Sequence, residues 1–120
     1  MDKLIGGKIM NLEKSSLRSL TKHMELIAHA FFDFQKDERN NYGLLDIDQF
    51  DSKHSQNAFV RKVEETYDEL SPVEQLFINN DFFGEEYPDW WRDIYTFSKY
   101  KQFKKRAIIH FLRIFYDDED

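Results

Sequence analysis

The stretch LRSLTKHMELIAHAFFDF, residues 17–34, carries the clearest structural signal in the chain. Its apolar residues recur at alternating steps of three and four, which places them along one face of a helix. They are Leu17, Leu20, Met24, Ile27, Phe31 and Phe34. Leu26, Ala30 and Phe32 widen this face. Because the face is wide and the heptad run is short, packing within the chain is favoured over dimerisation.

Further helices are expected on both sides of this one. Asn11 is a suitable N-cap for the first helix, and the Asn40–Gly43 stretch is a suitable end. Residues 44–55 are typical of a polar, acidic connector. A second helix is expected over residues 57–70, with these residues facing inward: Phe59, Val60, Val63, Tyr67 and Leu70.

The sharpest local signal is the tetrapeptide Ser71-Pro72-Val73-Glu74. Ser71 is a cap, proline suits the first helical position, and Glu74 completes a capping box. The helix that starts here should end by Gly84. Its inward residues are predicted to be Val73, Leu76, Phe77 and either Phe82 or Phe83.

Two more helices complete the predicted fold. A short one is expected from Pro88 or Asp89, containing Trp90, Trp91 and Ile94. The last should run over about residues 99–116. Its inward face is predicted to be Tyr100, Phe103, Ala107, Phe111 and either Leu112 or Ile114. The fold class is therefore all-α, with about five helices: a long N-terminal helix and a helical bundle, followed by a C-terminal helix-turn-helix.

At 120 residues the chain has room for one compact domain or two small helical lobes. We divide it into a disordered N-terminal extension (1–10), an N-terminal helical region (11–70), a helix-turn-helix region (71–116) and an acidic tail (117–120). The codons of Gly6–Gly7 can form a ribosome-binding sequence, which leaves open whether translation starts at Met1 or Met10. With no cysteine, disulfides and thiolate metal sites are excluded. Neither a signal peptide nor a membrane span is evident, so we expect a cytoplasmic protein without membrane contact.

The residues that could support catalysis are few. The four histidines show no metal-ligand spacing. The acidic run from Asp46 begins like a calcium loop, but Phe50 stands where a ligand belongs and Asn57 replaces the closing glutamate. There is no glycine-rich phosphate loop, and no serine or threonine has an evident base partner. We expect a protein that is not an enzyme and that holds no metal or cofactor.

Charge is distributed very unevenly along the chain, whose net charge is −6. Residues 64–91 contain nine acidic residues and no lysine or arginine. Residues 92–113 contain seven basic residues and the single acid Asp93. A basic helix in an acidic protein is typical of phosphate-backbone binding, but it is equally consistent with a solvated face balanced by acidic neighbours. The predicted last helix carries lysine and glutamine on the side opposite its apolar side. This arrangement favours phosphate-backbone binding, because a recognition helix needs both sides.

The segment Tyr95–Leu112 resembles the C-terminal helix of phage-encoded, ArpU-type transcriptional regulators, which are themselves similar to region 4 of sigma factors. The resemblance rests on an aromatic residue before Thr96, on Ser98 and Tyr100, and on the basic pair before Ala107. Leu70–Glu74 is similar to the opening of the same unit. Lys99 departs from the family, which has threonine there, and the helix before the turn lacks the usual alanine-rich core. These departures leave base-specific reading an open question.

The resemblance implies a DNA-binding transcriptional regulator of a phage or mobile element, with the last helix in the major groove of double-stranded DNA. Five cations would then hold phosphates: Lys99, Lys101, Lys104, Lys105 and Arg106. Ser98 and Gln102 would approach base edges. RNA polymerase and a second copy of the chain are the further partners that such modules use. The alternative function is a helical protein–protein interaction module that uses the acidic 64–89 surface.

Overall fold

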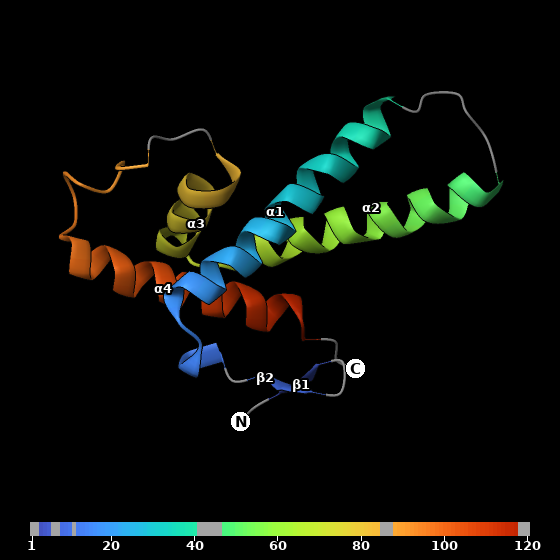
Figure 1. Ribbon diagram of the computed structural model, residues 1–120. Coiled ribbons are helices and arrows are strands. Elements are labelled where there is room, and N and C mark those ends of the chain that lie inside the picture. The colour runs from blue at the N-terminus through green and yellow to red at the C-terminus, as the bar shows by residue number, and fades with distance from the viewer. Residues whose placement is uncertain (1–2, 6–7, 11, 41–46, 85–87, 118–120) are drawn as a thin grey trace.

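The computed structural model describes the backbone of residues 3–5, 8–10, 12–40, 47–84 and 88–117. Side chains are described for residues 12–36, 57–84 and 88–117. Four α-helices dominate this part of the chain, so the predicted all-α class is confirmed. Figure 1 shows α1 and α2 as an antiparallel pair with α4 crossing below them, and α3 packs against α4.

Helix α1 (Leu17–Asn40) starts later than expected. The Ser16 hydroxyl accepts a hydrogen bond from the Ser19 amide at 3.1 Å, and a short 3-10 turn, η1 (Leu12–Lys14), stands where the sequence predicted the first helical turn. The expected apolar face is buried at Leu20, Met24 and Ile27, together with Ala28. Leu26 and Phe32 do not widen it: their exposed fractions are 69% and 44%. Leu26 is two residues from Met24, which on a helix turns it about 200° away from the core.

Helix α2 (Ile47–Asp68) includes most of the predicted connector. The rest of the connector, residues 44–46, lies outside the described residues. Val60, Val63 and Leu70 are buried as predicted, with Phe59 and Tyr67 packed partly buried against the core.

Helix α3 (Pro72–Ile78) confirms the predicted capping box. The Ser71 amide donates to Glu74 Oε1 at 3.0 Å, and the Glu74 amide donates to Ser71 Oγ at 3.3 Å. The predicted inward face is right for Phe77 but wrong for Val73 and Leu76, which are exposed; Ile78 is buried instead. The helix continues as a π-helical turn, η2 (Asn79–Phe83), up to Gly84.

The short helix expected from residue 88 or 89 is absent. Residues 88–94 form successive turns, held by backbone hydrogen bonds such as the one that the Tyr95 amide donates to the Trp91 carbonyl at 2.8 Å. Residues 84–96 therefore connect η2 to α4 (Phe97–Phe115). Helix α4 begins two residues before the predicted start because Thr96 Oγ1 accepts the Lys99 amide at 3.2 Å.

The core lies where α4 packs against α1, α2 and α3. Its most deeply buried large side chains come from α1, α3 and α4: Met24, Phe77, Ile78, Ile108, Phe111 and Leu112. At the N-terminus, β1 (Lys3–Ile5) and β2 (Lys8–Met10) form a two-stranded antiparallel sheet in which Lys3 pairs with Met10. The sequence predicted a disordered extension there, so the structure differs at this end.

Candidate nucleic-acid interface

Helix α4 has an inner and an outer face. Its inner face carries Tyr100, Ala107, Ile108, Phe111, Leu112 and Phe115, all buried. Phe103 and Ile114 are only partly buried. The outer face carries Lys99, Gln102, Arg106 and Arg113, all exposed. These outer residues follow steps of three, four and seven, so they form one stripe along the helix.

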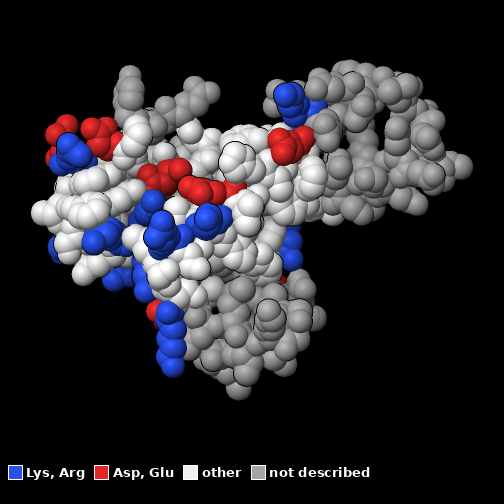
Figure 2. Space-filling view, viewed as in Figure 1, with Lys and Arg blue, Asp and Glu red and all other residues white. Residues whose placement is uncertain are grey.

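A groove of about 640 Å³ lies along this stripe. Gln102, Lys105 and Arg106 line it together with Ile109, His110 and Arg113 from the same helix. Two carboxylates, Glu13 and Glu74, line it from other elements. In Figure 2 the Lys and Arg side chains gather where Figure 1 places α4, with acidic side chains next to them. The groove therefore has a cationic majority, but it is not purely cationic.

The turn η1 lies against the basic helix. Arg113 forms an ion pair with Glu13, and Lys105 Nζ donates to the Glu13 carbonyl at 3.3 Å. The hydrogen bond from Arg113 holds the pKa of the Glu13 carboxyl below its usual value. Leu12, beside Glu13, is buried in the core cluster and anchors this turn. Two of the cations in the groove thus already have partners within the chain.

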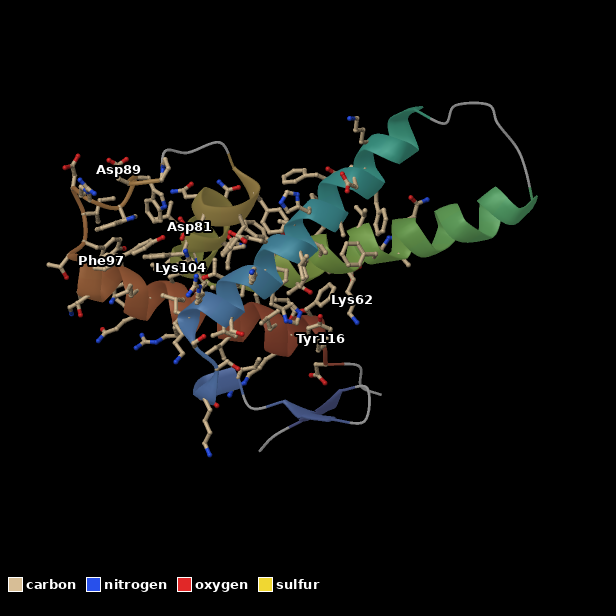
Figure 3. All side chains as sticks on the ribbon, in the orientation of Figure 1. Lys62, Asp81, Asp89, Phe97, Lys104 and Tyr116 are labelled. Atoms are coloured by element: carbon tan, nitrogen blue, oxygen red, sulfur yellow. The ribbon has the colours of Figure 1, made fainter. Side chains whose placement is uncertain are left out.

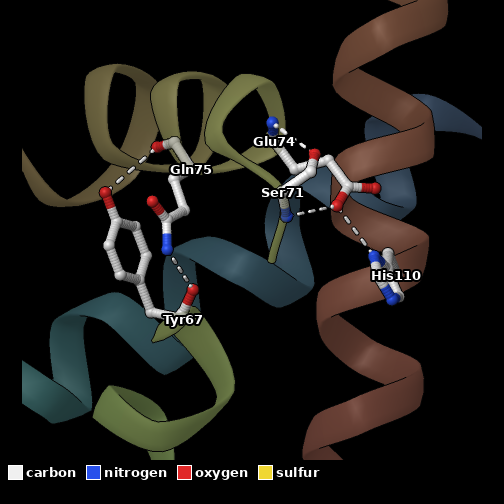
Figure 4. Close-up of polar contacts among 5 residues, drawn as sticks. All are labelled: Tyr67, Ser71, Glu74, Gln75 and His110. Atoms are coloured by element: carbon white, nitrogen blue, oxygen red, sulfur yellow. Dashed lines mark hydrogen bonds and ion pairs between the residues drawn. The ribbon is translucent and has the colours of Figure 1, made fainter. Parts of the chain in front are cut away.

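Glu74 joins α3 to α4 (Figure 4). Its Oε1 accepts both the Ser71 amide and Nδ1–H of His110, the latter at 2.8 Å. Burial raises the pKa of the Glu74 carboxyl, but the hydrogen bonds from Ser71 and His110 outweigh it, and the net pKa lies below the usual value. Tyr67 and Gln75 exchange two further bonds beside this contact, at 3.3 and 2.9 Å. The start of α3 is therefore fixed on both sides.

Lys104 does not belong to the outer face. Its Nζ lies 3.3 Å from Asp81 Oδ2 and 3.2 Å from the Tyr100 hydroxyl, and its side chain is 15% exposed. The Asp81 carboxylate, 7% exposed, also accepts bonds from Trp90 Nε1 and the Tyr100 hydroxyl, both at 2.7 Å. Figure 3 shows Asp81 and Lys104 between α3 and α4. Burial, followed by the bond to Asp81, raises the pKa of Tyr100 far above its usual value.

The other predicted site residues are solvent-accessible to different degrees. Ser98, Lys99, Lys101, Gln102 and Arg106 are exposed, and Lys105 is half-buried. Lys101 Nζ lies 4.5 Å from the centre of the Phe97 ring, and the Arg106 guanidinium lies 5.7 Å from that of Phe103. The structure thus brings Gln102, Lys105 and Arg106 together in the groove, leaves Ser98, Lys99 and Lys101 nearer the helix start, and separates Lys104 from both groups.

No protein-family model, curated protein or solved structure matches this chain. The resemblance to ArpU-type regulators therefore rests on the sequence motifs alone.

Sequence reasoning missed Arg113, His110, Glu13 and Asp81 as neighbours of the basic residues. Arg113 could have been found, because it continues the outer stripe seven residues after Arg106. Glu13 and Asp81 come from distant segments, and no local pattern points to them. Among the described residues no three or more acidic or histidine side chains are placed to hold a metal ion. None of the described helices has the length and apolarity needed to cross a membrane.

Proposed function

We propose that the chain is a DNA-binding transcriptional regulator that contacts double-stranded DNA through the outer face of α4. The observation that carries the proposal is the stripe of exposed Lys99, Gln102 and Arg106 on a helix whose opposite face is buried. A helix fixed from behind can enter a major groove while its outer side chains reach phosphates and base edges.

We propose the following roles for the residues of α4. Lys99, Lys101, Lys105 and Arg106 would hold phosphates, and Ser98 and Gln102 would approach bases. We leave Lys104 out, because its side chain is only 15% exposed and its ammonium group is paired with the Asp81 carboxylate. Lys105 stays, because the bond that it forms within the chain is to an exposed backbone carbonyl. Contacts with RNA polymerase or with a second copy of the chain are proposed from the family resemblance only.

The test is a double substitution on the outer stripe, Lys99→Glu with Arg106→Glu. Neither side chain is buried, so the fold should survive. The matched control is Arg18→Glu with Lys22→Glu, two exposed cations on α1 whose substitution changes the net charge by the same amount. Binding to duplex DNA is followed by fluorescence anisotropy between about 50 and 200 mM salt.

We expect wild type and the α1 variant to bind with similar, salt-sensitive affinities. The α4 variant should lose about 0.9 units of the logarithmic salt slope for each phosphate contact removed. Equal losses in both variants would mean that only the net charge matters, and the assigned face would be wrong. Absence of salt-sensitive binding by wild type at the lowest salt would refute the regulator proposal.

A second candidate function is a protein-interaction module, and one observation favours it. Glu64, Glu65, Asp68 and Glu69 are all exposed at the end of α2. The exposed apolar side chains of Val73 and Leu76 follow directly in the sequence, on α3. An acidic and apolar surface of this kind suits a basic amphipathic partner. Binding of such a partner should be unaffected by the Lys99/Arg106 substitutions.

A further inference from the structure

The start of α4 exposes an aromatic ring that the duplex proposal does not use. Phe97 is the first residue of the helix and its exposed fraction is 58%. Ile94, three residues earlier, is 63% exposed. Figure 3 shows Phe97 at the edge of the molecule, at the end of α4 opposite to Tyr116.

The ring is held in a fixed orientation by the aromatic residues behind it. Phe97 is stacked on Trp91, with ring centres 5.7 Å apart and 30° between the planes. Trp91 is stacked on Tyr100 at 4.4 Å and 15°. The Tyr100 hydroxyl donates in turn to the buried Asp81 carboxylate. Because the supporting rings are packed and hydrogen-bonded, a flat group can stack on Phe97 with little loss of side-chain freedom.

Two cationic side chains lie against the Phe97 and Trp91 rings. Lys101 Nζ lies over the Phe97 ring, 4.5 Å from its centre, so a stacking base must displace this ammonium group, which then binds an adjacent phosphate. The Arg92 guanidinium lies 5.9 Å from the centre of the Trp91 ring. Lys99 is exposed in the same helical turn as Phe97. The exposed acid Asp93 is the only acidic residue between residues 92 and 101. The surroundings of the ring therefore favour an anionic ligand.

We infer that Phe97 is a stacking platform for an unpaired base of single-stranded nucleic acid, with Arg92, Lys99 and Lys101 holding the adjacent phosphates. An exposed aromatic ring among cations is the arrangement that binds single strands without sequence preference. A base inside a duplex cannot offer its flat face to Phe97, so this ligand is distinct from the duplex. The inference stands on Phe97 and does not depend on the groove.

The experiment compares three fluorescent probes: an oligothymidylate of about 12 residues, an oligomer of the same length made of abasic sites, and a duplex. The abasic oligomer keeps the phosphates and lacks the bases. Wild type should bind the oligothymidylate about 5- to 160-fold more tightly than the abasic oligomer, the range that corresponds to stacking of one base. An oligouridylate of equal length shows whether the strand is DNA or RNA.

Phe97→Leu keeps an apolar side chain but removes the aromatic face, and it should abolish the preference for bases without weakening abasic binding. Phe32→Leu is the matched control, because Phe32 is an exposed phenylalanine on α1. It should leave the preference unchanged.

Equal binding of both oligomers by wild type, or an unchanged preference in the Phe97 variant, would overturn the inference while leaving duplex binding to be judged on its own probe. Two other results would assign the ring to another occupant and also overturn the inference. One is a Phe97-dependent change in the sedimentation of the protein alone, and the other is Phe97-dependent binding to anionic lipid vesicles without a base preference.

Discussion

Replacing Asp81 by alanine should destabilise the fold more than any surface change. Its carboxylate, 7% exposed, accepts hydrogen bonds from Trp90 and Tyr100 and pairs with Lys104. The substitution leaves the ammonium group of Lys104, whose side chain is 15% exposed, without its counter-charge, and it leaves two donors without their acceptor. Breaking a buried ion pair from one side costs about 3–5 kcal/mol. For a chain of this length that corresponds to a fall in melting temperature of about 12–20 °C.

Thermal unfolding followed by circular dichroism measures this effect. Asp93→Ala is the matched control, because Asp93 is an exposed aspartate in the neighbouring segment and should change the stability by less than about 0.5 kcal/mol. Adding Lys104→Met to Asp81→Ala should restore part of the loss, since the unpaired ammonium is then removed. Our account of the cluster would be refuted if Asp81→Ala melted within about 2 °C of wild type, or if the Lys104 substitution lowered the stability further.

Two other predictions follow from burial. Phe111→Ala should lower the free energy of unfolding by about 3–5 kcal/mol, and Phe103→Ala should lower it less because its ring is only partly buried. Urea titration that ranked the two variants in the opposite order would show that the inner face of α4 is wrongly assigned. Burial raises the pKa of Tyr67, Tyr100 and Tyr116, so the folded state retains phenolic protons that the unfolded state loses. The stabilisation from these protonated phenols should be fully present below pH 10.0, the ordinary pKa of tyrosine, and should fall as the pH rises above it. Melting temperatures that stay constant to about pH 11 would contradict this.

Features that depend on neighbours in the sequence were predictable. The capping box at Ser71 and Glu74 needs only residues three apart, and its hydrogen bonds form as expected. The apolar face of α1 follows from its 3.6-residue period, and Leu20, Met24 and Ile27 are buried accordingly. In both cases the information is local.

Features that depend on distant partners were not predictable. Lys104 was assigned to phosphates because a lysine in a basic helix is normally solvated. Its position four residues after Tyr100 places it on the inner face. A charged group is stable there because Asp81, in the π-helical turn η2, pairs with it. The segment around Trp90 and Trp91 has helical periodicity, yet bonds from Trp90 to Asp81 and the stacking on Tyr100 hold it in turns.

Helix α4 packs against α1, α2 and α3, so these three helices lack a packing partner until α4, which follows them in the chain, has been synthesised. A nascent chain that ends before Thr96 has the apolar faces of α1 and α3 but lacks the surface that covers them. Its N-terminal segment is also without its partners, since Glu13 pairs with Arg113 and His23 lies 2.7 Å from the Tyr116 hydroxyl. Cooperative folding during translation should therefore begin only after α4 has left the ribosome, and until then the exposed faces are substrates for chaperones and proteases.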